Sequence, residues 1–135
     1  MQLPRLMIRA VALPTAAFAL GINCRGSSQC MLVSTSDASE AIQGYIQAAI
    51  DTGSGGNFYH EGKQIGCKDS ICAFYQSGAS GDLNDAITHI NNIVNHGCGN
   101  CGSDPTQPGN DVSKGELTVN YVSSPTCTNG LCDPA

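Results

Sequence analysis

Eight cysteines have the clearest capacity for chemistry in this chain, because a thiol can form a disulfide, bind a soft metal or act as a nucleophile. They are Cys24, Cys30, Cys67, Cys72, Cys98, Cys101, Cys127 and Cys132. Which of these reactions they perform depends on the compartment, since disulfides form and persist outside the reducing cytosol.

The first nineteen residues have the pattern of an export signal. Arg5 and Arg9 precede a short apolar run, 10–19, that ends in the small-x-small triplet AFA. The run is shorter than the roughly 20 residues of a membrane span, and Pro14 would break a buried helix there. The pattern predicts a signal peptide over 1–19, a mature domain over 20–135 that begins at Leu20, and a secreted, extracellular protein.

Export predicts that the cysteines form four disulfides, although their pairing stays open on this evidence. The alternative is zinc, because Cys98 and Cys101 have the spacing of metal ligands and His96 lies beside them. The other close pairs have four residues between their cysteines, and the oxidising route favours disulfides. We therefore expect no metal and no cofactor.

The remaining titratable residues form no catalytic motif. His89 and His96 are seven residues apart and lack a third ligand or a nucleophile, whereas Asp82 and Asp85 suit the first turn of a helix. We expect no enzymatic activity. The alternative is a small hydrolase that uses His89 or Asp85.

The charge of the chain excludes further classes of partner. The net charge is −5, and loss of Arg5 and Arg9 with the signal peptide would leave −7. Such a surface repels nucleic acid and anionic lipid. With no later apolar stretch that could span a bilayer, we expect neither nucleic-acid binding nor membrane insertion, and a single domain that is monomeric.

Two segments have the apolar spacing of amphipathic helices. The first covers 38–50, with Ser36 or Asp37 as its cap, and the second covers 83–94, between Asp82 and Gly97.

Segments 63–67, 71–76 and 116–122 have the composition of strands, whereas 102–105 and 108–110 have the composition of turns. The order of elements predicts an α+β fold: a two-layer sandwich of an antiparallel sheet with both helices on one face.

Three strings carry a resemblance to a known family. They read LGINCRGSSQC over 20–30, NHGCGNCGSDP over 95–105 and GNDVSKGELTVNYV over 109–122. In order and approximate spacing they resemble the killer toxins of the smut-virus type, which block calcium channels, and their fungal relatives.

This resemblance implies a sheet of about five strands covered by two antiparallel helices. It also implies disulfides that join Cys24 to Cys98, Cys30 to Cys101 and Cys67 to Cys127. The pair Cys72–Cys132, which has no counterpart in the family's prototype, would be left over. The prototype has a further disulfide between its helices, and Ile87 occupies one of those cysteine positions here.

The same resemblance implies a binding site made of basic residues. Ile65 occupies the position of a lysine that is important in the prototype, and Lys63 is the nearest base, on the same side of an expected strand. Arg25 and Lys114 match bases of the family's strings, and their role is either structural or functional. These four residues are the candidate binding residues.

The resemblance implies a toxin that binds a cell-surface membrane protein, a calcium channel, of a competing fungus or a host. The acidic charge opposes that target, because cation channels carry acidic rings at their mouths. The alternative is a secreted structural or wall-associated protein of the same fold.

Overall fold

The computed structural model describes residues 20–134, so the signal peptide predicted over 1–19 lies outside the described residues. Two α-helices, α1 (Ala38–Asp51) and α2 (Leu83–Asn95), and two 3-10 turns, η1 (Ser28–Met31) and η2 (Val112–Lys114), are present. The strands are β1 (Phe58–Tyr59), β2 (Gln64–Lys68), β3 (Ile71–Gln76), β4 (Gly81–Asp82), β5 (Gly102–Pro105), β6 (Glu116–Tyr121) and β7 (Gly130–Leu131).

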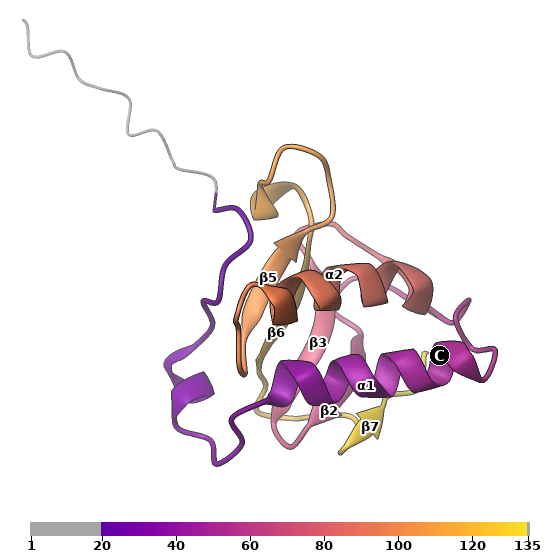
Figure 1. Ribbon diagram of the computed structural model, residues 1–135, viewed down its shortest axis with the longest axis horizontal. Helices are drawn as coiled ribbons and strands as arrows, with labels where there is room; N and C mark the ends of the chain where they lie inside the picture. The colour runs from indigo at the N-terminus through magenta and orange to yellow at the C-terminus, as the bar shows by residue number, and fades with distance from the viewer. Residues whose placement is uncertain (1–19, 135) are drawn as a thin grey trace, which may run out of the picture.

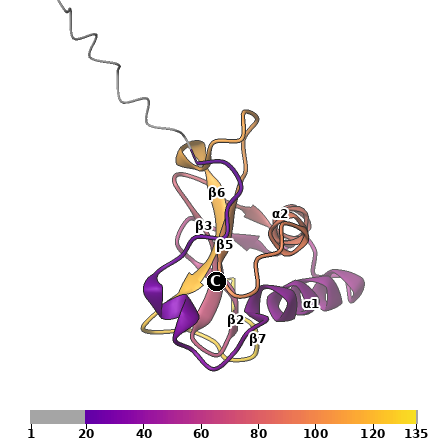
Figure 2. The same cartoon turned by 60° about the vertical axis from the view of Figure 1, so that its left-hand side comes forward.

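The predicted two-layer α+β sandwich is confirmed (Figure 1). Five strands form an antiparallel sheet in the order β5-β6-β3-β2-β7, and β1 pairs with β4 in a separate two-stranded sheet. Both helices lie against one face of the large sheet and run antiparallel to each other (Figures 1 and 2). None of the helices within 20–134 is long and apolar enough to cross a membrane.

The core lies between the helices and the sheet, where apolar side chains spaced three or four apart on each helix meet alternate side chains of the strands. Ile42, Ile46, Ile90 and Ile93 are fully buried on the helices. Ile87 packs at the edge of the same core, partly buried. It therefore contributes packing at a position where the resemblance implied a cysteine in the prototype.

The ends of α2 follow the sequence prediction. Asp82 accepts a hydrogen bond from the Asp85 amide at 2.8 Å, and the Asp85 side chain accepts one from the Asp82 amide at 3.2 Å. Gly97, past the end of the helix, has a φ of 88°, which glycine adopts without strain.

One local prediction is wrong. Gly102–Pro105 forms β5 rather than a turn, and Asn23 of the N-terminal segment makes a single bridge to Ser103 of that strand. The Asn23 backbone comes so close that a Cβ on Gly102 would lie 2.7 Å from the Asn23 oxygen. Glycine and proline suit this strand because it lies at the edge of the sheet. Glycine permits the close approach of the Asn23 backbone, and proline cannot donate a backbone hydrogen bond to a further strand.

Candidate functional site

Two disulfides secure the N-terminal segment as the resemblance implied. Cys24 is bonded to Cys98 and Cys30 to Cys101, with sequence separations of 74 and 71. They hold the segment against the end of α2 and the start of β5. Asn100, between the two bonded positions, donates hydrogen bonds to the Cys30 and Thr35 carbonyls and accepts one from the Ala38 amide.

The pairing of the other four cysteines differs from the expectation. The structure joins Cys67 to Cys72 and Cys127 to Cys132, so the implied bonds Cys67–Cys127 and Cys72–Cys132 are wrong. The reason is local geometry. Cys67 and Cys72 face each other across the β2–β3 hairpin with their Cα atoms 4.1 Å apart, and the Cα atoms of Cys127 and Cys132 are 5.0 Å apart.

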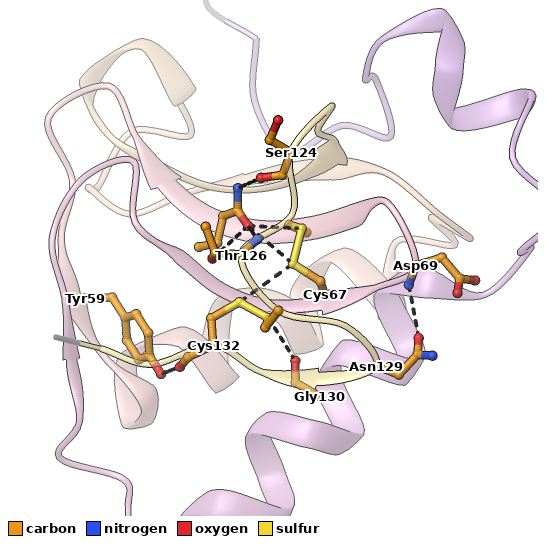
Figure 3. Close-up of a disulfide and its surroundings, with 11 residues drawn as sticks. Tyr59, Cys67, Asp69, Ser124, Thr126, Asn129, Gly130 and Cys132 are labelled. Carbon is orange, nitrogen blue, oxygen red and sulfur yellow. Dashed lines mark hydrogen bonds between the residues drawn. A yellow bond between two sulfur atoms is a disulfide. The ribbon is translucent and has the colours of Figure 1, made fainter.

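The four cysteines nevertheless form one cluster, on the face of the sheet opposite the helices (Figure 3). The Sγ atoms of Cys67, Cys127 and Cys132 lie within 4.8 Å of one another. All three belong to disulfides, and a bonded sulfur is no thiolate ligand, so the cluster in this state is a cross-link rather than a metal site.

Polar contacts attach the C-terminal segment beside this cluster (Figure 3). The Gln64 side chain donates to the Ser124 carbonyl at 3.2 Å and accepts from the Thr126 amide at 2.6 Å. The Asp69 amide donates to Asn129 at 3.1 Å, and the Tyr59 hydroxyl donates to the Cys132 carbonyl at 2.7 Å. Burial raises the pKa of Tyr59, and the charge of Asp133 adds to this effect.

The structure places the candidates Lys63 and Ile65 differently. Ile65 is completely buried in the core, so its side chain is not on the surface that a partner would contact. Lys63 is half-buried and precedes β2, and the strand register shifts between Gln64 and Gly66. Because Lys63 lies outside the strand, the alternation that was expected to align it with Ile65 does not apply.

Arg25 and Lys114 are both exposed. Arg25 borders a groove of about 290 Å³ on the face of the sheet opposite the helices. Thr118 and Asn120 of β6 also line this groove. Lys114 ends η2, whose Val112 borders the same groove. Ile65, inside the core, and Arg25, at this groove, therefore do not belong to one surface.

A histidine–carboxylate pair is the arrangement that sequence reasoning missed. His89 Nδ1 lies 2.7 Å from Asp104 Oδ2, which also accepts from Asn92 at 3.0 Å. Asp104 lies on the segment that was expected to be a turn. The residues around it in the sequence therefore did not predict that it lies opposite α2. His89, Asp85 and Ser80 line a pocket of about 280 Å³. Within the described residues no hydroxyl or thiol is hydrogen-bonded to His89, so the pair lacks an activated nucleophile.

A sheet covered by two antiparallel helices, in a chain cross-linked by four disulfides, defines a small disulfide-rich α+β protein. The chain belongs to the Kp4 family, whose model matches residues 7–123. It is 45% identical over 124 residues to the KP4 killer toxin of Ustilago maydis P4 virus, an alignment that covers 85% of this chain and 90% of the toxin. The family predicted from the three cysteine- and glycine-rich strings is thereby confirmed.

Proposed function

We propose that residues 20–135 are secreted and act as a killer-toxin-like protein that binds a membrane protein on the surface of a target cell, without an enzymatic step. The observation that carries this proposal is the 45% identity to a viral killer toxin over most of both chains. Four disulfides, with no free cysteine in the described residues, suit an oxidising, extracellular environment.

The proposed class of target is a calcium channel. An acidic ring at a channel mouth repels a protein of net charge −7, so binding must come from local positive charge. Lys63 precedes β2 and Lys68 is its last residue, and Arg25 and Lys114 are exposed. Lys63 is the proposed contact because it is the base nearest the position of the family's lysine, although Ile65 itself is buried.

The test is growth inhibition and calcium uptake of a sensitive fungus or a plant root with the purified, oxidised protein. We expect inhibition that added calcium relieves. Lys63→Ala should raise the half-inhibitory concentration at least about tenfold, which corresponds to about 1.4 kcal/mol of binding free energy. Lys68→Ala is the matched control, because this second half-buried lysine is the last residue of β2, the strand that Lys63 precedes. Equal effects of the two variants, at unchanged circular dichroism, would contradict a specific role for Lys63.

Secretion is tested independently of activity. Expression of the full chain in a secreting fungal host should give a protein whose N-terminal residue is Leu20, because signal peptidase cuts after the small-x-small triplet. N-terminal sequencing or intact mass measures this directly. Recovery of material that retains Arg5 and Arg9 would contradict the export route.

The second candidate function is that of a structural or wall-associated protein. The observations that favour it are the acidic charge and the burial of Ile65 at the position of the family's lysine. Retention on isolated fungal wall polysaccharide, without growth inhibition at micromolar dose, would support this function over channel binding.

A further inference from the structure

The outer face of the sheet carries a second, small apolar cluster that consists mainly of sulfur. Cys67 and Cys72 are 0% exposed and Cys132 is 4% exposed, whereas Cys127 is half-buried and packs at the edge of the cluster. Phe74 and Val122 complete it. Water and dissolved thiols therefore reach this pair of disulfides through Cys127.

The two disulfides are in contact with each other. Cys67 Sγ lies 3.7 Å from Cys132 Sγ, a sulfur of the neighbouring bond (Figure 3). A disulfide exchanges when a thiolate attacks one of its sulfurs and the other sulfur leaves. A thiolate released at Cys132 would thus begin at van der Waals contact with the sulfur that it must attack.

Surrounding contacts keep this arrangement in place. Gln64 holds the segment at Ser124 and Thr126, the Asn129 side chain accepts from the Asp69 amide, and the Tyr59 hydroxyl binds the Cys132 carbonyl. The backbone of Cys132 also donates to the Ile65 carbonyl at 2.8 Å. Opening of one disulfide leaves these contacts intact, so the released sulfur stays near its target.

We propose that this cluster is a thiol–disulfide exchange site that reacts with an external thiol and passes the bond from one disulfide to the other. The external thiolate attacks Cys127 Sγ, forms a mixed disulfide there and releases the Cys132 thiolate. Cys132 attacks Cys67 Sγ, which forms Cys67–Cys132 and releases the Cys72 thiolate. Cys72 attacks the mixed disulfide at Cys127, which forms Cys72–Cys127 and returns the external thiolate. No electron is gained or lost overall.

The exchange changes what the cross-links constrain. Each original bond closes a loop with a sequence separation of 5, whereas Cys67 and Cys132 are separated by 65 residues. The product therefore ties the C-terminal segment covalently to β2 and restricts the unfolded chain more. We expect the exchanged protein to unfold at a higher denaturant concentration than the starting form.

The first experiment uses the wild-type protein. The protein is incubated anaerobically at about pH 8 with sub-stoichiometric reduced glutathione and quenched in acid. Free thiols are blocked with a maleimide before the pH is raised for cleavage, and the product is analysed by disulfide mapping. Trypsin cuts after Lys68 between Cys67 and Cys72, and hydroxylamine cuts Asn129–Gly130 between Cys127 and Cys132. The expected products are peptides joined through Cys67–Cys132 and Cys72–Cys127, with Cys24–Cys98 retained. Complete persistence of the two local bonds, or glutathione held at Cys127 with no new pair, would overturn the proposal.

The second experiment isolates the transfer step. Cys127→Ser leaves Cys132 as a free, 4% exposed thiol and needs no external thiol. After acid unfolding and maleimide labelling, the label is expected on Cys72, because Cys132 has displaced it from Cys67. Cys24→Ser is the matched control for the Cys72 label, since it frees Cys98, which is 5% exposed and borders a pocket with Cys30 and Cys101 rather than the cluster. The proposal would be overturned if Cys132 carried the label and Cys72 were labelled no more in Cys127→Ser than in Cys24→Ser.

Discussion

Asn100 shows how much a single side chain contributes to this fold. Its amide group makes three hydrogen bonds, to the Cys30 carbonyl at 2.9 Å, the Thr35 carbonyl at 2.7 Å and the Ala38 amide at 3.1 Å. It therefore closes the loop before α1 and satisfies one of the free amides at the start of that helix, where Asp37 makes no capping bond with its side chain.

At the residue scale we predict that Asn100→Ala lowers the free energy of unfolding by about 2–3 kcal/mol, roughly one per hydrogen bond lost. Urea denaturation followed by far-ultraviolet circular dichroism measures this. Asn91→Ala is the control, because Asn91 accepts one hydrogen bond, from Gln43, and should cost less than about 1 kcal/mol. Equal losses in the two variants would argue against the bridging role of Asn100.

Strand β3 lies in the middle of the sheet and carries a buried ionisable group. Tyr75 is 1% exposed and donates its hydroxyl proton to the Asp82 carbonyl at 3.2 Å, at the start of α2. Burial raises the pKa of Tyr75, and the charges of Asp85 and Asp82 raise it further. The hydroxyl thus links the central strand to the capped end of the helix only in its protonated form.

At the element scale this link predicts a loss of stability in alkali. The folded state holds the Tyr75 proton more tightly than the unfolded state, so its contribution is complete below the ordinary tyrosine pKa of about 10 and is lost as pH rises above it. The free energy of unfolding should fall there by up to about 1.4 kcal/mol per pH unit for this group.

Urea titrations at a series of pH values up to about 11 measure how steeply the free energy of unfolding falls with pH. Tyr59 should make this fall steeper, because burial raises its pKa as well. Tyr75→Phe should show a shallower fall than the wild type. Tyr121→Phe, which removes a tyrosine hydroxyl from a half-buried position on β6, is the comparison variant. A Tyr75→Phe slope equal to that of the wild type would mean that this hydroxyl does not link the strand to the helix.

The whole molecule is held by two kinds of disulfide. Cys30–Cys101 closes a sequence separation of 71 and fastens the N-terminal segment to the sheet, whereas Cys67–Cys72 closes a separation of 5 within one hairpin. In the chain-entropy model a cross-link stabilises by restricting the unfolded state, and more so for a longer loop. The N-terminal bonds should therefore dominate global stability.

At this scale we predict that replacing both Cys30 and Cys101 by alanine costs about 4 kcal/mol, against about 2 kcal/mol for replacing both Cys67 and Cys72. Guanidinium denaturation of the two double variants, with intact mass to verify the remaining bonds, makes the comparison. An equal or reversed order would show that native-state packing around the cluster outweighs loop length.

The sequence by itself determined the family, both helices and three of the sheet strands. The helices were predictable because their signal is local. Apolar residues that recur about every 3.6 positions can be recognised within a short stretch of sequence. The strings that surround Cys24 and Cys98 carried the family resemblance, and with it these N-terminal cross-links.

The tertiary structure alone decided what depends on residues distant in sequence. Gly102–Pro105 became a strand because β6 and Asn23 lie beside it, and His89 met Asp104 because that strand packs under α2. Ile65 was removed from the surface by a register shift in β2. The last two disulfides were decided by which sulfurs the hairpin and the C-terminal turn bring together, since sequence gives the number of cysteines but not the distances between their sulfur atoms.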